Sequence, residues 1–309
     1  MQKEVVIGTR GSKLALWQTE FVANRLKKSG ISTRIKVIET KGDRVQDVSI
    51  LKIGSKGVFT EEIEEQLRAG EIDIAVHSAK DLPSNLPKDL QIIAFTEREK
   101  ACDVLLGFRK NISLRDPEIV IGTSSTRRIA TLKHYYGNVK TAEIRGNLQT
   151  RIKKLKEGQC DALLLAYAGV YRMGYSDLIV QELPTDVFTP AVGQGSLAIE
   201  SSIDLSDFVV QPIRGVLNHE TTEKLLLAER AFLRELEGGC SIPAFALAEL
   251  TEEGGIKLHA GIFSLDGKQL VRESTKFNID DHEKEGEKLA TTVLAKGGRE
   301  ILNDIRSKL

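Results

Sequence analysis

The 309-residue sequence contains few cysteines and no excess of either charge. Its three cysteines, Cys102, Cys160 and Cys240, are far apart and form no CxxC pair. Three cysteines are too few, and odd in number, for a disulfide framework, and their spacing disfavours a cysteine zinc site. The 44 Lys and Arg residues balance 44 Asp and Glu residues, which argues against a general nucleic-acid binder. We therefore expect no bound metal and no nucleic-acid partner.

Long hydrophobic runs and nucleotide-binding motifs are also missing. No window approaches 18 consecutive apolar residues, so we expect no membrane span. The first ten residues lead into a strand without the charged and apolar regions of a signal peptide. The lack of a visible signal peptide and the small number of cysteines together predict that the protein resides in the reducing cytoplasm. The absence of a Walker A motif, a GxGxxG motif and a nucleophile elbow leaves ATP, NAD and acyl-hydrolase chemistry without support.

Alternating apolar patterns predict an α/β fold for the first two thirds of the chain. The first hundred residues have the order β-α-β-α-β, and a second unit of the same kind follows the segment 97–103. The predicted strands cover residues 4–8, 32–40, 71–78, 118–122, 141–146 and 161–166. The predicted helices cover residues 12–30, 60–70, 123–137, 147–158 and a turn or two at 167–174. Residues 189–200 carry one Pro and two Gly before an apolar strand, as a crossing between domains would.

The last hundred residues predict a smaller α+β domain. A strong amphipathic helix at 218–239 precedes a β-hairpin at 256–274, whose turn is indicated by Asp266-Gly267. Two further helical stretches close the chain.

Cationic and hydroxyl side chains follow almost every predicted strand, where ligands bind in an open α/β sheet. These residues are Arg10, Ser12, Ser78, Lys80, Thr123, Arg127, Arg128, Arg145 and Arg172. Arg151 lies one helical turn further on, and Lys52 and Lys56 lie on a glycine-bearing loop. Any one such residue is more often simply exposed. Their clustering predicts a cleft between two α/β domains that binds a polyanion, since the Arg fork matches carboxylate and phosphate groups.

Two residues stand apart from this cationic set. Asp81 either caps a turn before Pro83 or is the one carboxylate in a basic cleft, facing a cation formed during a reaction. Cys240 follows two glycines and a helix C-terminus, whose dipole disfavours a thiolate. A free cysteine is most often a small buried hydrophobe. Even so, the glycines allow close approach, and a modest thiol can anchor a strong electrophile.

Seven segments together resemble the porphobilinogen deaminase family, also called hydroxymethylbilane synthase, over essentially the whole chain. They are TRGSKLALWQ, KGVFTEEIE, DIAVHSAKDLP, GTSSTRR, IRGN, PAVGQGSLAIE and LEGGCSIP, in the order that the family has them. The resemblance implies three domains, of which the first two are similar to periplasmic binding proteins and the third carries the cysteine. Their boundaries would be 1–98 with 194–212, then 99–193, then 213–309.

The resemblance also implies an activity and a cofactor. The family condenses four porphobilinogen molecules head to tail with loss of ammonia, and releases the linear tetrapyrrole hydroxymethylbilane by hydrolysis. A dipyrromethane cofactor would be attached to Cys240 by a thioether, and Asp81 would be the catalytic carboxylate. Cofactor contacts would come from Ser78, Lys80, Thr123, Ser125, Arg127, Arg128, Arg145 and Gly146. Substrate contacts would come from Arg10, Ser12, Gln18, Lys52, Lys56, Arg151 and Arg172. The family is usually monomeric.

Two other functions fit parts of the sequence. A non-catalytic anion-binding protein would suit the two α/β domains, although the LEGGC segment counts against it. An enzyme acting on a phosphate ester would suit the cations, but the sequence has no phosphate loop and no metal cluster. Ala79, Thr126, Ser241 and Ile242 depart from the family pattern without changing a charged or nucleophilic residue.

Overall fold

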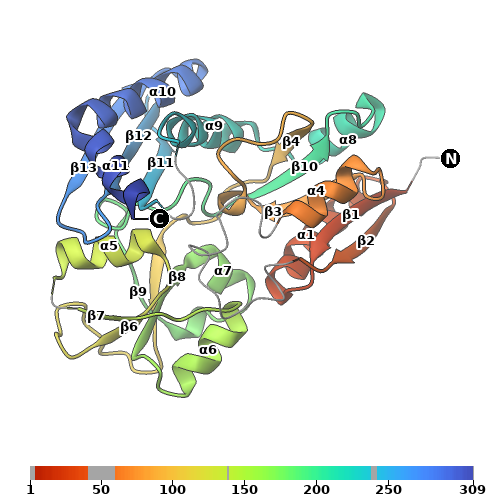
Figure 1. Cartoon of the computed structure of the whole chain (residues 1–309). Coiled ribbons are helices and arrows are strands. Elements are labelled where there is room, and N and C mark those ends of the chain that lie inside the picture. The colour runs from red at the N-terminus through yellow and green to blue at the C-terminus, as the bar shows by residue number, and fades with distance from the viewer. Residues whose placement is uncertain (1–3, 41–59, 138, 238–241, 309) are drawn as a thin grey trace. The chain divides into compact units, whose positions relative to one another are not determined.

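A computed structural model describes residues 4–40, 60–137, 139–237 and 242–308 (Figure 1). Three predicted site residues, Lys52, Lys56 and Cys240, lie outside these ranges. The chain divides into two compact units, which we describe separately. Unit 1 comprises Met1–Glu99 and Gly195–Glu223, and unit 2 comprises Lys100–Gln194 and Lys224–Leu309.

Unit 1 contains a five-stranded sheet in the order β2-β1-β3-β10-β4. Its strands are β1 (Val5–Arg10), β2 (Thr33–Ile38), β3 (Ile74–Ser78), β4 (Leu90–Phe95) and β10 (Leu197–Ser202). β1 is parallel to β2 and β3, whereas β10 is antiparallel to both β3 and β4. A strand from late in the chain is therefore inserted beside the strand that leads to Asp81.

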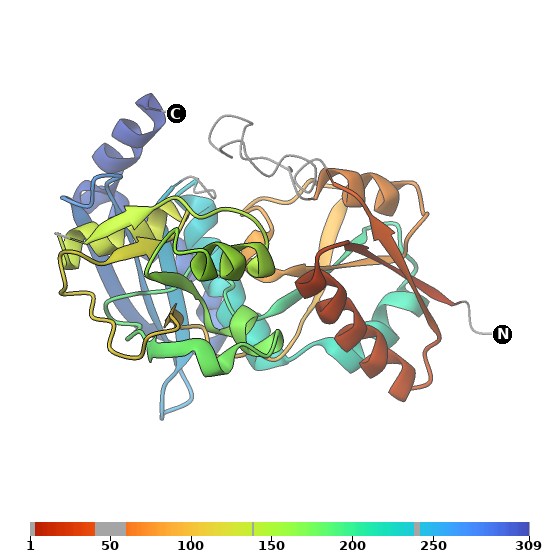
Figure 2. The same cartoon turned by 90° about the horizontal axis from the view of Figure 1, so that it is seen from below.

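Helices cover both faces of this sheet, and Figure 2 shows α1 and α8 on one side and α4 on the other. The helices are α1 (Lys13–Lys28), α4 (Glu61–Arg68) and α8 (Asp207–Leu217). Ser12 caps α1 by accepting a hydrogen bond from the Ala15 amide, and three acidic residues occupy the first turn of α4. On the α1 face, Val22 and Leu26 pack against Ile74 and neighbouring residues of the sheet.

Unit 2 begins with a second five-stranded sheet, in the order β7-β6-β8-β5-β9. Its strands are β5 (Asp103–Leu106), β6 (Val120–Gly122), β7 (Lys140–Ala142), β8 (Ala162–Ala166) and β9 (Ile179–Glu182). Its helices are α5 (Thr126–Tyr135), α6 (Leu148–Lys156) and α7 (Tyr167–Arg172). β6 is parallel to β7 and β8, and β5 is antiparallel to β8 and β9. The two sheets thus share one pattern of strand directions.

The C-terminal part of unit 2 is an antiparallel sheet in the order β11-β12-β13, packed against helices. Its strands are β11 (Ala244–Leu250), β12 (Ile256–Phe263) and β13 (Leu270–Phe277). Its helices are α9 (Glu220–Glu235), which begins in unit 1, α10 (His282–Val293) and α11 (Arg299–Ser307). The predicted hairpin at Asp266-Gly267 is confirmed, with Gly267 at a φ of 73°.

This hairpin contacts α5, the helix that carries Arg127 and Arg128. His134 Nδ1 donates a hydrogen bond of 2.8 Å to the carbonyl oxygen of Gly267. Ala130 of α5 is buried in one cluster with Phe245 and Phe263. A Cβ atom at Gly267 would lie 2.7 Å from the carbonyl oxygen of Ala130, so only glycine allows this approach.

The predicted fold class, α/β with a smaller C-terminal domain, is confirmed. The sequence analysis did not predict β4, β5, β9, β11 or α8, the last of which contains Pro212. In the described part of the chain, no helix combines the length and hydrophobicity that a membrane crossing needs.

Candidate functional site

A pocket in unit 1 brings together five of the predicted site residues. Arg10, Ser12, Gln18, Ser78 and Asp81 line it, with Leu14, Ala15, Thr60, Val76 and His77. The residues come from the carboxyl ends of β1 and β3 and from the start of α1, which is where an open α/β sheet places its ligands. The pocket volume is about 80 Å³. This is well below the roughly 300–1,000 Å³ of a whole small-molecule site, so the pocket suits one arm of a ligand.

Hydrogen bonds hold the pocket wall in place. Gln18 Nε2 donates to Ser78 Oγ at 2.9 Å, which ties α1 to the end of β3. The amide of Ala79 donates to the carbonyl oxygen of Ser196 at 3.0 Å, which ties the same strand end to the residue before β10. The turn that carries Asp81 therefore begins at a strand end that is hydrogen-bonded on two sides.

Asp81 ends a short 3₁₀ turn, Ala79–Asp81, and its side chain is exposed. Among the described residues it forms no hydrogen bond and no ion pair. The structural alternative requires Asp81 to cap the turn before Pro83. Without such a hydrogen bond, this alternative is not supported. Within the described lining of this pocket, it is the one carboxylate and Arg10 is the one guanidinium.

In unit 2, Arg127 and Arg128 lie at the start of α5 and are buried, with 4% and 6% of their surface exposed. Both donate to the fully buried carboxylate of Asp103, Arg127 to Oδ2 at 2.8 Å and Arg128 to Oδ1 at 2.7 Å. Gln194 Nε2 is a third donor to this carboxylate, at 2.9 Å. Two guanidiniums and one carboxylate leave one net positive charge in this network. In addition, Nε of Arg128 is buried and has no hydrogen-bond partner among the residues that the structure describes.

Two predicted hydroxyls lie at the N-terminus of α5. Ser125 caps the helix by accepting from the Arg128 amide, and Thr123 is buried and accepts from the Ser125 amide at 3.3 Å. Both hydroxyls thus organise the first turn of the helix that carries the two arginines.

The IRGN segment forms a third group in unit 2. Arg145 pairs with Glu143, with 2.7 Å between Nε and the carboxylate. Arg151 Nε donates to the carbonyl oxygen of Gly146 at 2.7 Å. Gly146 has a φ of 108°, and a Cβ there would lie 2.7 Å from Thr150 Cγ2, so the turn into α6 requires glycine. The two other predicted residues, Lys80 in unit 1 and Arg172 in unit 2, are half-buried.

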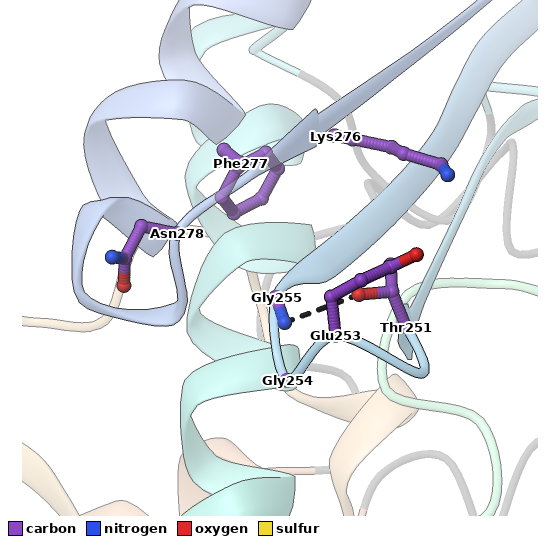
Figure 3. Close-up of a pocket in the computed structure, with 7 residues that line it drawn as sticks. All are labelled: Thr251, Glu253, Gly254, Gly255, Lys276, Phe277 and Asn278. Carbon is purple, nitrogen blue, oxygen red and sulfur yellow. Dashed lines mark hydrogen bonds between the residues drawn. The ribbon is translucent and has the colours of Figure 1, made fainter.

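The C-terminal domain contains a larger pocket that the sequence analysis did not predict (Figure 3). About 340 Å³ in volume, it is lined by Thr251, Glu253, Gly254, Gly255, Lys276, Phe277 and Asn278. The Gly255 amide donates to Thr251 Oγ1 at 3.1 Å, as expected in a hairpin turn. None of the predicted site residues lines this pocket. The described residues also contain no group of three His, Cys, Asp or Glu side chains that could hold a metal ion.

Family models match most of the chain. The dipyrromethane cofactor binding domain of porphobilinogen deaminase matches residues 5–209, and the C-terminal domain of the same enzyme matches residues 224–295. The chain belongs to the porphobilinogen deaminase family. A porphobilinogen deaminase from Cytophaga hutchinsonii is 53% identical and covers 100% of this chain and 99% of its own length. One from Desulfosudis oleivorans is 51% identical and covers 99% of both.

Solved structures of solute-binding proteins also align with the chain. A TRAP periplasmic solute binding protein from Pseudomonas putida, with bound D-glucuronate, is 10% identical with a TM-score of 0.40, covering 70% of this chain and 78% of its own. The L-cystine solute receptor of Neisseria gonorrhoeae is 16% identical with a TM-score of 0.39, covering 74% and 91%.

Membership of the porphobilinogen deaminase family confirms the predicted activity. The chain is a transferase, a hydroxymethylbilane synthase that condenses porphobilinogen with loss of ammonia, and its cofactor is a dipyrromethane. The non-catalytic anion-binding alternative is not favoured.

Proposed function

We propose that Asp81 is the catalytic carboxylate of this porphobilinogen deaminase. Loss of ammonia from porphobilinogen leaves an azafulvenium cation, and an exposed carboxylate close to that cation stabilises it by charge. The observation that carries this proposal is the partner-free carboxylate of Asp81 in a pocket with Arg10, Ser12 and Ser78. Because no described side chain neutralises Asp81, its full charge is available to the reacting group.

We further propose that Cys240 holds the dipyrromethane through a thioether, with Arg127 and Arg128 binding cofactor carboxylates. When bound, the cofactor supplies the terminal pyrrole ring to which the first substrate unit is added. The support is the net positive charge beside Asp103 and the unpartnered Nε of Arg128, because a buried excess charge favours an anion close by. The other proposed cofactor contacts are Ser78, Lys80, Thr123, Ser125, Arg145 and Gly146.

Substrate carboxylates are the proposed ligands of a second set of residues. Porphobilinogen carries an acetate and a propionate, so each added ring brings two negative charges for Arg forks and Lys ammonium groups to bind. The proposed contacts are Arg10, Ser12, Gln18, Lys52, Lys56, Arg151 and Arg172. The three-domain division, a monomeric state and a cytoplasmic location also stay as proposals.

Removal of the Asp81 carboxylate tests the catalytic proposal. Asp81→Ala and Asp81→Asn should fold and carry the cofactor mass, while ammonia release falls about 100-fold or more, since one well-placed charge contributes this much. Asp204→Ala removes an exposed carboxylate of unit 1 that does not line the pocket, and serves as the matched control. Ammonia release near the wild-type rate in Asp81→Asn would remove Asp81 from this role.

A further inference from the structure

A buried pair of ionisable side chains lies directly beside the Asp81 pocket. His77, on β3, and Glu200, on β10, are 6% and 0% exposed, and His77 Nε2 lies 3.1 Å from Glu200 Oε2. Glu200 is opposite Ala75 in the antiparallel ladder, so its side chain shares a face of the sheet with His77, two residues further on. The pair links the strand that precedes Asp81 to the strand inserted next to it.

Among the described residues, this contact is the one interaction of the Glu200 side chain. Neither of its carboxylate oxygens has an aligned hydrogen bond to any described residue, and the same holds for His77 Nε2. A fully buried carboxylate without hydrogen bonds is costly, and a packed apolar pair at such a place is usually as stable or more so. Stability therefore does not explain why two ionisable groups occupy this position, and an ionisable pair beside a reactive pocket points to function.

His77 belongs both to this buried pair and to the lining of the Asp81 pocket. His77 lines that pocket together with Ser78 and Asp81. Its Nε2 faces Glu200, whereas Nδ1 is not among the buried atoms that lack a partner. A carboxylate at one imidazole nitrogen fixes the ring and makes the other nitrogen a better proton acceptor. A buried acid orients a histidine general base through a hydrogen bond to one ring nitrogen, and the 3.1 Å between Nε2 and Oε2 is within reach of such a bond once the two groups align.

We propose that Glu200 orients His77 to accept the proton that each condensation releases. This inference rests on the proposed role of the Asp81 pocket. Porphobilinogen reacts with its aminomethyl group protonated, so that the C–N bond breaks and its electron pair leaves with neutral ammonia. The α-carbon of the terminal pyrrole ring then forms a C–C bond to the resulting methylene cation. The C–H bond at that α-carbon breaks last, its electron pair restores the aromatic ring, and the proton passes to Nδ1 of His77. The released ammonia then takes the proton from the imidazolium and leaves as ammonium.

Asp81 and His77 have different tasks in this scheme. Asp81 carries the negative charge that faces the cation before the C–C bond forms, and His77 acts after that bond has formed. Glu200 is a positioning residue, since it is fully buried and acts through the imidazole. Loss of its charge should therefore slow proton removal without weakening substrate binding.

Glu200→Gln isolates the charge, because it keeps the size of the side chain and an oxygen facing Nε2. The expected result is a kcat about tenfold lower at an unchanged KM. Porphobilinogen deuterated at its free α-carbon should also show a larger isotope effect on kcat than in the wild type, because proton removal becomes slower. Glu229→Gln is the burial-matched control: Glu229 is also 0% exposed but accepts from the amides of Gly193 and Ala248 in unit 2. It should lower stability and leave the isotope effect unchanged.

The double variant His77→Gln with Glu200→Gln separates function from folding. His77→Gln alone leaves a buried carboxylate without its imidazole partner and is expected to unfold more easily. The double variant replaces the pair with two neutral amides, so the Tm should recover toward the wild-type value while kcat stays about 100-fold low. Recovery of kcat together with Tm, or an unchanged kcat and isotope effect in Glu200→Gln, would overturn the proposal. A failure of the Asp81 proposal is distinguishable, because Asp81→Asn would then release ammonia at the wild-type rate.

Discussion

Arg128 Nη2 lies 2.7 Å from Oδ1 of Asp103, in an ion pair whose two side chains are almost completely buried. Arg127 occupies the other oxygen of the same carboxylate at 2.8 Å. The two arginines that are proposed to bind the cofactor are therefore fixed by a carboxylate on β5. A guanidinium held in this way loses little side-chain freedom when an anion arrives, which favours binding.

Asp103→Asn should strongly destabilise unit 2. The variant keeps the shape of the side chain but leaves two buried guanidiniums without a counter-charge. Breaking a buried pair in this way costs about 3–5 kcal/mol. The free energy of unfolding in urea measures the loss. Glu118→Gln breaks the exposed pair of Glu118 with Lys140 and should change the stability by less than about 1 kcal/mol. Equal effects of the two substitutions would contradict the buried-pair argument.

The same carboxylate makes stability depend on pH. Burial alone would raise the pKa of Asp103, but the charges of Arg127 and Arg128 outweigh burial and hold this pKa below its usual range. A depressed folded-state pKa stabilises the protein at any pH above the unfolded value of about 3.9, and this contribution disappears as the pH falls through the folded pKa. The gap in unfolding free energy between wild type and Asp103→Asn should stay constant from about pH 6 to 8 and narrow below about pH 4. A constant gap down to pH 3 would show that the carboxylate is not paired.

Local sequence patterns predicted the parts of the fold whose causes are local. The predicted helices at 12–30 and 123–137 are present, capped by Ser12 and Ser125, and Asp266-Gly267 forms the predicted hairpin turn. Short strands such as β5 were not predicted, because its four residues are all buried and so show no alternation of apolar and polar side chains. Helix α8 was missed because Pro212 lies inside it and argues against a helix.

Site features that depend on distant residues could not be read from the sequence. Asp103 is 24 residues from Arg127, and Glu200 lies on β10, which joins the first sheet although it follows Lys100–Gln194 of unit 2 in the sequence. No spacing rule links such positions. The buried contact of His77 with Glu200 becomes visible only through the β3–β10 register. Full burial of a charged residue indicates such a site, and burial can be measured only in a structure.

Gly146, which precedes α6, should tolerate alanine less well than Gly158, which follows the same helix. Gly146 and Gly158 both have positive φ angles, 108° and 78°, so alanine is strained at each. Only at Gly146 would the added Cβ also meet another residue, Thr150 Cγ2, at 2.7 Å. Gly158→Ala should therefore cost about 1 kcal/mol, and Gly146→Ala about 1–3 kcal/mol more, because the helix start must shift. Equal losses in urea unfolding would show that Thr150 rotates away.

The proposed thioether at Cys240 predicts how many thiols the active enzyme contains. The sequence has three cysteines, and a thioether sulfur does not react with iodoacetamide. Alkylation of the denatured wild type should therefore modify Cys102 and Cys160 alone, and the intact mass should exceed the chain mass by one dipyrromethane. Cys240→Ser should also show two reactive thiols, but without the extra mass and without activity. In the native protein, burial raises the pKa of Cys160 to about 11 and also raises that of Cys102, so both thiols should react slowly near neutral pH. Three alkylated cysteines in a preparation that still converts porphobilinogen would exclude a covalent link through Cys240.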